Sequence, residues 1–230
     1  MAGIPAARLE SAVRTPLFSD FSEEEADAFI RAQGGELLRF PAGSVITETA
    51  EPAPPERLLL ILEGVVHLVR YGVHGDRYMI DYTLAGGVVG SMDDAGEMRI
   101  HSSIFLAGSA CTLLQLSARR APGTPPVLWL RFTQGLLRTA SRKNARLMQK
   151  ADIISRRTVR EKLRAFLSYE QQIHGGSVFD IPLSRQELAD YICIDRTTLS
   201  TELSRMAAEG LLHTRRSHFE LSGDWSQVES

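Results

Sequence analysis

The sequence has few cysteines and no long hydrophobic run. Of its 230 residues only two are cysteine, Cys111 and Cys193, and they lie far apart and form no motif. In a reducing compartment we expect both to be buried thiols. No apolar stretch approaches the ~20 residues that a membrane-spanning helix needs. The first residues, MAGIPAARLE, lack the hydrophobic region of a signal peptide, so a cytoplasmic protein without a membrane partner is expected.

An excess of charge of one sign is also missing, because the formal net charge is −2. The hydrophobic fraction of 43% is enough for packed cores and argues against disorder. Basic residues are nevertheless concentrated, since residues 131–164 contain eleven Lys/Arg and two acids. This basic segment could supply phosphate contacts to a nucleic acid, or it could be a solvated helix face.

Residues 183–212, LSRQELADYICIDRTTLSTELSRMAAEGLL, predict two short helices joined by a tight turn. Ser184 and Glu187 form the S-x-x-E capping box that begins a helix. Asp195 is a typical N-cap for the second helix, and Gly210 marks its end. The apolar residues at helical spacing are Leu188, Tyr191, Ile192, Leu199, Leu203 and Met206. We interpret the segment as a helix-turn-helix, whose second helix can lie in a DNA major groove, the alternative being a buried helical hairpin.

Polar residues at the beginning of the second helix lie off its apolar stripe, where a recognition helix meets base edges. Residues 211–221, LLHTRRSHFEL, alternate and predict a two-stranded wing. The candidate DNA-binding residues are Ser184, Arg185, Asp195, Arg196, Thr197, Thr198, Ser200, Thr201, Arg205 and Arg215. Double-stranded DNA is therefore the expected partner.

The N-terminal part has the pattern of β-structure. After a short predicted helix at residues 22–33, residues 37–117 contain short apolar or alternating runs separated by glycine and proline. The clearest runs are residues 58–62, 65–71, 77–84 and 111–117. Many short strands with glycine-rich turns predict a small barrel or jelly roll.

Residues 127–154 predict one long helix with a heptad repeat. Its two heptad series are Leu130, Leu137, Asn144 and Ala151, and, three places later, Thr133, Ala140, Leu147 and Ile154. We expect a two-stranded dimer seam formed by Leu130, Leu137, Ala140, Asn144, Leu147 and Ala151. An asparagine at such a position fixes the register of two helices. The alternative is a helix packed on its own chain, with Asn144 facing water.

A break near residues 155–158 precedes another amphipathic helix, REKLRAFLSYEQQI, with Leu163, Phe166 and Leu167 turned inward. We therefore predict an α+β chain with three parts. These are an effector-type β-roll (residues 1–124), a long dimerisation helix (residues 125–155) and a winged helix-turn-helix domain (residues 156–230).

This order of parts resembles the cyclic-AMP receptor protein / fumarate-nitrate regulator (Crp/Fnr) family of bacterial transcription factors. The resemblance covers essentially the whole chain and is most specific at RQELADYICIDRTTLSTELSRMAAEGLL. It implies a homodimeric, cytoplasmic DNA-binding regulator that responds allosterically to an effector, with RNA polymerase as a further partner. The effector, the target genes and the direction of regulation are left open.

The recognition helix departs from the family pattern of an Arg, a Glu one place later, and a second Arg four places after the Glu. Arg196 matches the first Arg, but Thr197 and Thr201 occupy the other two positions. Arg196 can still read guanine with its planar fork. The operator of the best-known members is therefore not expected, and a regulator that has lost specific DNA binding and acts as an interaction protein is the alternative.

The nucleotide pocket departs further. Members that bind cyclic AMP resemble one another in a cassette whose Glu holds the ribose and whose Arg holds the phosphate. Here Ser91 replaces that Glu, His101 replaces that Arg, and Leu147 replaces a polar residue that meets the base. We therefore expect no cyclic AMP and an unknown small-molecule effector, or a roll that serves as a scaffold. The expected pocket comprises Gly90, Ser91, His101, Ser102 and Leu147.

Other cofactors and enzyme classes are not favoured. His101 could ligate haem, but His67 and His74 have no ligand spacing to it, so a hydrogen-bonded histidine is the alternative. Residues 1–110 contain no cysteine, which argues against the iron–sulfur cluster of the oxygen-sensing relatives. A cupin-like metal enzyme would have to use Glu63, His67, His74 and Glu97, which do not form cupin motifs. No G-x-S-x-G, P-loop or G-x-G-x-x-G sequence occurs, so no enzyme, no metal and no cofactor are predicted.

Overall fold

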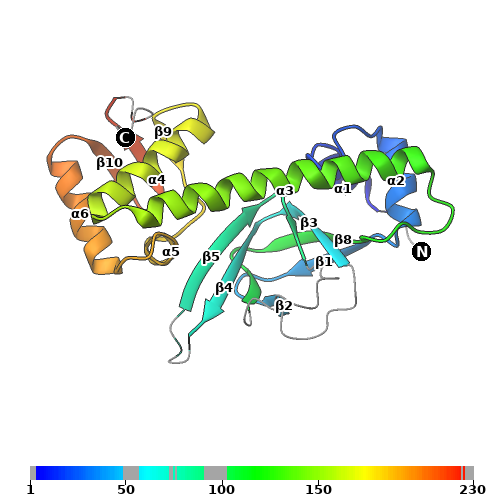
Figure 1. The fold of residues 1–230 in the computed structure, drawn as a ribbon, viewed down its shortest axis with the longest axis horizontal. Helices are drawn as coiled ribbons and strands as arrows, with labels where there is room; N and C mark the ends of the chain where they lie inside the picture. The colour runs from blue at the N-terminus through cyan, green and yellow to red at the C-terminus, as the bar shows by residue number, and fades with distance from the viewer. Residues whose placement is uncertain are drawn as a thin grey trace. The chain divides into compact units, whose positions relative to one another are not determined.

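A computed structural model describes residues 4–48, 57–72, 75, 77–90, 103–223 and 225. The chain divides into two compact units, unit 1 (residues 1–144) and unit 2 (residues 145–230). Among the described residues, no helix is both long enough and apolar enough to cross a membrane. The structure contains both helices and strands, so the α+β fold class predicted from the sequence is confirmed (Figure 1).

Unit 1 begins with two helices, α1 (Ala6–Val13) and α2 (Glu23–Ala32). The second confirms the helix predicted at residues 22–33, because Ser22 and Glu25 form a reciprocal capping box at its beginning. Two four-stranded antiparallel sheets follow, with strand orders β1-β8-β3-β6 and β2-β7-β4-β5. Their strands are β1 (Glu36–Phe40), β2 (Val45–Glu48), β3 (Arg57–Glu63), β4 (Val65–Tyr71), β5 (Arg77–Leu84), β6 (Val88–Val89), β7 (Ser103–Ala107) and β8 (Cys111–Ser117).

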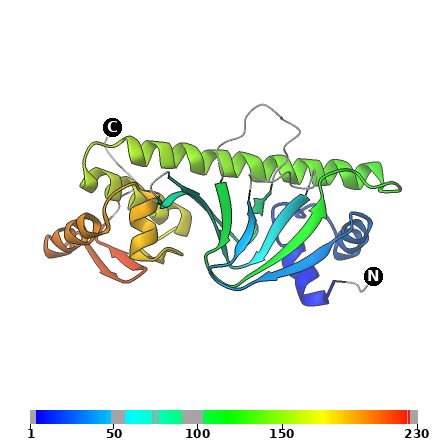
Figure 2. The same ribbon diagram turned by 90° about the horizontal axis from the view of Figure 1, so that it is seen from below.

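The run LLLIL in β3 is buried on both faces of its sheet, which explains why it is apolar without alternation. Leu58, Leu60 and Leu62 face a core built with α1, α2 and the beginning of the long helix (Figures 1 and 2). Leu59 and Ile61 face a second core against β4 and β7 of the other sheet. The strand is therefore the central element of unit 1.

The long helix α3 (Pro126–Ser155) confirms the prediction for residues 127–154. In unit 1 its Phe132 is fully buried against Phe18 and Phe29, with ring centroids 6.1 and 4.8 Å away. A Cβ atom at Gly135 would lie 2.2 Å from the carbonyl oxygen of Leu17. Any larger residue would therefore push α3 away from the N-terminal segment.

Unit 2 contains the end of α3, then α4 (Val159–His174), β9 (Val178–Asp180), α5 (Arg185–Tyr191), α6 (Arg196–Ala208), β10 (Leu212–Arg215) and β11 (His218–Leu221). The break predicted at residues 155–158 is present, because α3 ends at Ser155 and Thr158 is the N-cap of α4. The predicted inward residues Leu163, Phe166 and Leu167 are buried.

Two expectations are corrected. The wing is three-stranded, with order β10-β11-β9, because β11 also pairs with the three-residue strand β9. Cys111 is buried as expected, but Cys193 is exposed. Cys193 comes two residues after Tyr191, the last residue of α5, and has a positive φ of 55°. The buried apolar residues at this end of α5 are Leu188, Tyr191 and Ile192 instead.

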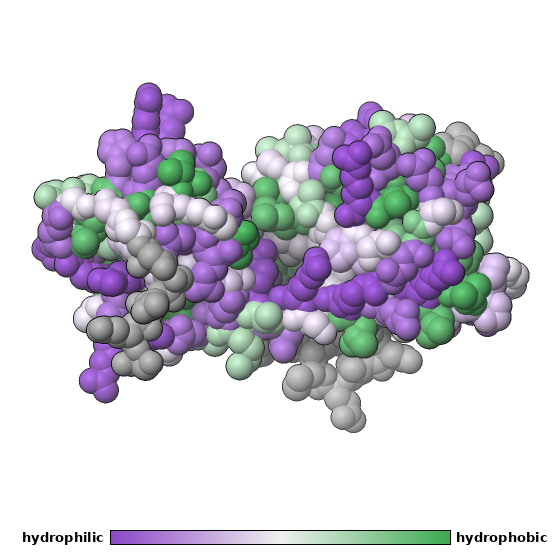
Figure 3. Space-filling model, turned by 90° about the horizontal axis from the view of Figure 1, so that it is seen from above, coloured by the Kyte–Doolittle hydropathy of each residue, from purple (hydrophilic) through white to green (hydrophobic). Residues whose placement is uncertain are grey.

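Hydrophobic residues on the face shown in Figure 3 are scattered among hydrophilic ones. The large apolar side chains that remain exposed in the described single chain include four on α3: Leu130, Leu137, Leu147 and Ile154. All four belong to the predicted heptad series. The opposite side of the same helix is buried at Leu128, Phe132 and Ile153.

Candidate nucleic-acid interface

The first helix of the helix-turn-helix is held by a complete capping box. The Ser184 hydroxyl accepts from the backbone N–H of Glu187 at 3.3 Å, and the Ser184 N–H donates to the Glu187 carboxylate at 2.7 Å. The turn closes where the N–H of Ile194 donates to the carbonyl of Ala189 at 3.0 Å. These local bonds explain why the sequence predicts the position of the turn to within about a residue.

Asp195 begins α6. Its Oδ1 accepts from the backbone N–H groups of Thr197 at 2.7 Å and Thr198 at 3.2 Å. Hydrogen bonds from Thr198 and Thr197 hold the pKa of Asp195 below its ordinary value. The Asp195 carboxylate, predicted among the DNA-binding residues, is therefore engaged in organising the helix terminus.

One face of α6 is buried and the other is open. Leu199, Leu203 and Met206 are at most 3% exposed, as their spacing predicts. The predicted DNA-binding residues of this helix are exposed and polar: Arg196, Thr197, Thr198, Ser200, Thr201 and Arg205. The structure therefore brings this part of the predicted set together on one open helix face.

The hydroxyls on that face share one arrangement. Ser200, Thr201 and Ser204 each donate to the carbonyl oxygen four residues earlier, at 2.9 Å. Their lone pairs remain able to accept hydrogen bonds. Ser204 is exposed and was missed by the sequence prediction, although it lies one turn after Ser200.

The wing adds two cations. Arg215 at the end of β10 is exposed, and so is Arg216, which has a positive φ of 54° in the turn before β11. The turn is tied by the Thr214 hydroxyl, which donates to the carbonyl of His218 at 2.8 Å. Arg216 was not among the predicted residues, and the signal for it is the pair of arginines in TRRSH.

Unlike the exposed arginines of α6 and the wing, Arg185 packs against the wing. Its guanidinium carbon is 4.8 Å from the centroid of the Phe219 ring, and Nη2 donates to the Thr214 hydroxyl. Burial lowers the pKa of Arg185. The side chain predicted to contact DNA thus connects α5 to the wing through a cation–π contact and a hydrogen bond.

Much of the basic segment at residues 131–164 is engaged in ion pairs. Arg131 pairs with Glu25 at 2.9 Å, Arg138 with Asp20 at 2.8 Å, and Arg156 with Asp152 at 3.0 Å. These three cations are therefore neutralised within the chain. Arg157 is exposed and lies within the break between α3 and α4.

The predicted effector pocket is only partly described. Ser91, His101 and Ser102 lie outside the described residues, as do His74 and Glu97. Gly90 is in unit 1, where its positive φ of 131° and the nearby carbonyl of Arg57 leave no room for a side chain. Leu147 is in unit 2 and is 38% exposed on α3.

The cupin-type candidates among the described residues do not form a metal site. Glu63 pairs with Arg8 and accepts from the Thr112 hydroxyl at 3.1 Å, while His67 is buried. Within the part of the chain that the structure describes, no group of three His, Cys, Asp or Glu side chains could hold a metal ion.

Comparisons with known proteins agree with this geometry. Residues 161–222 match the family model of the Crp-like helix-turn-helix domain. The chain is 27% identical over 161 residues to the nitrogen fixation regulation protein FixK of Bradyrhizobium diazoefficiens, and the match spans 66% of each chain. These relatives are transcription regulators rather than enzymes.

The fold is that of solved Crp/Fnr structures. The FixK2 structure from Bradyrhizobium japonicum has a TM-score of 0.65 and 18% identity, covering 83% of this chain and 93% of that one. TTHA1359, a Crp/Fnr-family transcriptional regulator from Thermus thermophilus, has a TM-score of 0.61 and 19% identity, covering 82% and 94%. The c-di-GMP responsive global regulator CLP of Xanthomonas campestris has a TM-score of 0.64 and 19% identity, covering 88% and 100%. Residues 161–222 are therefore similar to the Crp-like helix-turn-helix domain, and the chain has the fold of solved Crp/Fnr regulators.

Proposed function

We propose that the protein is a homodimeric regulator that reads a specific DNA sequence by placing α6 in the major groove. The observation that carries this proposal is the open polar face of α6, which combines a capped N-terminus with exposed Arg196, Thr197, Ser200 and Thr201. Side chains near the N-terminus of such a helix reach base edges, and Arg196 has the fork that matches guanine. Arg215 and Arg216 on the wing would contact the phosphate backbone.

Thr197 and Thr201 would influence which DNA sequence α6 prefers. A threonine can donate or accept a hydrogen bond and its methyl group can contact the methyl group of thymine. Thr197 and Thr201 replace a Glu and an Arg of the frequent family pattern, so they cannot supply a carboxylate to cytosine or a second fork to guanine. The operator should therefore differ from that of regulators with the charged pattern.

The dimer would form along α3. Leu130 is 57% exposed, Leu137 68% and Ile154 39%, although their spacing is that of a coiled-coil seam. Asn144 is also exposed and lies at an a position, where it would fix the register. Two recognition helices related by a two-fold axis would read half-sites about 34–36 Å apart on a pseudo-palindromic operator.

The effector is proposed to be a small molecule other than cyclic AMP. An effector bound near the roll would change how α3 packs in the dimer, and residues 155–158 would act as the hinge that re-aims α6. The hinge has its own hydrogen bonds, since the hydroxyl of Ser155 donates to the carbonyl of Asp152 at 2.7 Å and the N–H of Thr158 donates to Glu161 at 2.9 Å. RNA polymerase is the further partner expected of an activator.

The test begins with duplexes selected by the wild-type protein from a random pool. Fluorescence anisotropy then compares the selected operator with a scrambled duplex between about 50 and 200 mM salt, where phosphate contacts weaken strongly. We expect tighter binding to the operator, a steep salt dependence, and a particle of twice the 25.4 kDa chain mass in light scattering. Equal, weak binding to both duplexes would overturn the DNA-reading proposal and favour a regulator that acts through protein contacts.

A further inference from the structure

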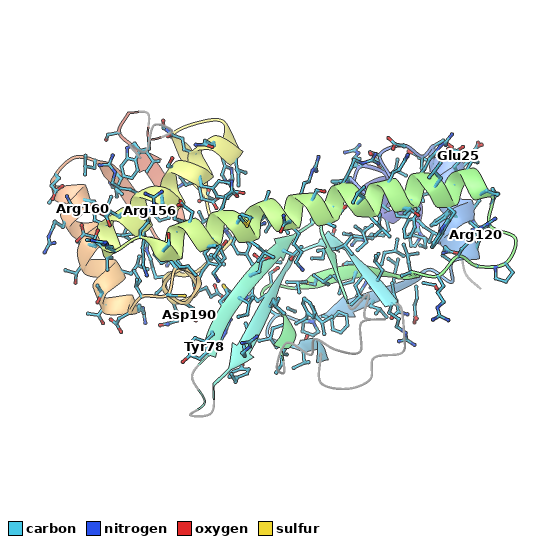
Figure 4. The ribbon with its side chains drawn as sticks, viewed as in Figure 1. Glu25, Tyr78, Arg120, Arg156, Arg160 and Asp190 are labelled. Atoms are coloured by element: carbon cyan, nitrogen blue, oxygen red, sulfur yellow. The ribbon has the colours of Figure 1, made fainter. Side chains whose placement is uncertain are left out.

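One guanidinium group joins α4 to two positions on the recognition helix. The Nε of Arg160 donates to Oε1 of Glu202 at 2.5 Å. Its Nη1 and Nη2 donate to the two carboxylate oxygens of Glu209 at 2.8 and 2.7 Å. Arg160 lies in the first turn of α4, facing α6 (Figure 4).

The two carboxylates are well placed to fix the direction of α6. Glu202 and Glu209 are seven residues apart, which is nearly two helical turns, so both lie on the same side of the helix. Glu202 is in the middle of α6 and Glu209 is its C-cap residue. A single planar group bound to both restrains the rotation of the helix about its axis and its tilt.

This restraint complements the other contacts of α6. Asp195 holds the N-terminus and the apolar stripe holds the buried face. Apolar packing is non-directional, whereas a bidentate arginine–carboxylate pair has a fixed geometry. Arg160 therefore adds a directional restraint to the C-terminal half of α6, beside the apolar packing of Leu203 and Met206.

Arg160, Glu202, Glu209 and Arg205 form one network of ion pairs. The side chain of Glu202 is only 10% exposed and also pairs with Arg205, whose Nη1 donates to Oε2 at 3.1 Å. The side chains of Glu209 and Glu202 raise the pKa of Arg160, and the Arg160 guanidinium lowers the pKa of Glu209. Arg160 and Glu209 therefore each stabilise the charged form of the other.

We propose that Arg160 is a positioning residue for DNA recognition: by clamping Glu202 and Glu209 it aims α6, and so sets discrimination between DNA sequences without touching DNA. This inference rests on the proposed function, because it concerns how the same helix reads DNA. Arg160 is two residues after Thr158, the N-cap of α4 at the end of the break at residues 155–158. Any movement of α4 about that break is therefore passed to α6 through this clamp.

A charge effect and a positioning effect differ in what they predict for the affinity ratio of Glu209→Gln: a pure charge effect leaves the ratio unchanged, and a positioning effect lowers it. This substitution removes one negative charge, so electrostatics alone would tighten binding to every duplex. Loss of the bidentate pair would instead lower the ratio of operator affinity to scrambled-duplex affinity. Arg160→Lys keeps the charge and loses the fork, so it too should lower the ratio.

The experiment measures that ratio for wild type, Arg160→Lys, Glu209→Gln and the control Arg157→Gln, which removes an exposed cation close in sequence. We expect the affinity ratio to fall roughly 3- to 30-fold in Arg160→Lys and in Glu209→Gln. This is the range seen when substitutions that do not touch a ligand change the energetic coupling between sites. The control should weaken both duplexes alike. An unchanged ratio in Arg160→Lys and Glu209→Gln would overturn the proposal.

Amide hydrogen exchange of the full chain provides a readout that needs no DNA. The amides of the C-terminal half of α6 should exchange faster in Arg160→Lys and Glu209→Gln than in wild type or Arg157→Gln, while those of α2 in unit 1 should not change. Equal exchange across all four proteins would show that Arg160 does not anchor α6. If wild type binds no duplex selectively but the exchange differences are present, the DNA-reading function fails and the anchor stands.

Discussion

The carboxylate of Asp195 accepts a hydrogen bond from the backbone N–H of Thr197 at 2.7 Å, and this contact begins the recognition helix. Because such bonds favour the charged form, they lower the pKa of Asp195 in the folded protein. The contribution of this carboxylate to folding is fully present above the unfolded-state value of about 3.9. It is lost as the pH falls through the lower folded-state pKa.

We therefore predict that Asp195→Ala lowers the melting temperature at pH 7. The difference in melting temperature between this variant and wild type should shrink as the pH falls below the unfolded-state pKa of about 3.9. Asp195→Asn is the matched control, because an asparagine oxygen can accept the same bonds without titrating. The difference in melting temperature between Asp195→Asn and Asp195→Ala should not depend on pH. Thermal denaturation at pH 7 and at about pH 3 measures this, and a pH-independent wild-type advantage would contradict the role of the charged cap.

Arg185 was predicted from the sequence to contact DNA, but in the structure it contacts Phe219 and Thr214. Arg185→Met removes the contacts to Phe219 and Thr214 while keeping an apolar stem, so unfolding should become easier by about 1–2 kcal/mol. Chemical denaturation measures this effect, and Arg185→Lys should lose less because it keeps the charge over the ring. If stability is unchanged but the salt slope of DNA binding falls by about one, then Arg185 contacts a phosphate as its sequence position suggests.

Arg196 is expected to read a base. Arg196→Ala should weaken binding to the selected operator by about 1–3 kcal/mol and relax the preference at one base pair. Arg216→Ala is the comparison, since a phosphate contact should weaken all sequences alike and reduce the salt slope by about one. Band-shift titrations on the operator and on base-swapped operators separate the two. Unchanged affinity and preference for Arg196→Ala would remove it from the base-reading set.

Leu137 is one of the exposed heptad residues of α3 and is 68% exposed in the single chain. Leu137→Glu would place a charge in the proposed seam, where it would be buried without a partner. The dimer should dissociate, and most DNA affinity should be lost with it because one half-site remains. Arg142→Glu is the control, since Arg142 is exposed on α3 outside the heptad positions. Light scattering that finds a monomeric wild type would refute the seam.

Features held by local hydrogen bonds could be predicted from the sequence. The capping box of Ser184 and Glu187 and the cap at Asp195 locate α5 and α6 closely, because each depends on residues within three places. The long helix was predicted to within a residue at each end because its heptads extend over most of its length.

Features that depend on distant residues could not be predicted. Arg160 and Glu202 are 42 positions apart, and neither carries a motif that points to the other. Strand β9 has three residues and is defined by its pairing with β11, so the wing appeared two-stranded in the sequence. Cys193 has the apolar character of a buried residue, but its place in the turn, at a positive φ, leaves it exposed.

The last prediction concerns the ligand. A cyclic nucleotide carries a charged phosphate that must lose water on binding, and a buried charge is tolerated only when it is paired. An arginine fork provides that pairing in the cassette that this chain resembles, whereas here the sequence has His101, which is mostly neutral at pH 7 at an unperturbed pKa of about 6.5. Ser91 offers no carboxylate for the ribose, and Asp93 and Asp94 are close in sequence and would repel the phosphate.

We therefore expect calorimetry to detect no binding of cyclic AMP or cyclic GMP at micromolar concentrations, and we expect neither nucleotide to change DNA affinity. Micromolar binding that disappears in His101→Ala would contradict it. The phosphate would then have to be held by an imidazolium and backbone amides, and an acidic shift of the optimum for binding, toward pH values where the imidazole is protonated, would identify that arrangement.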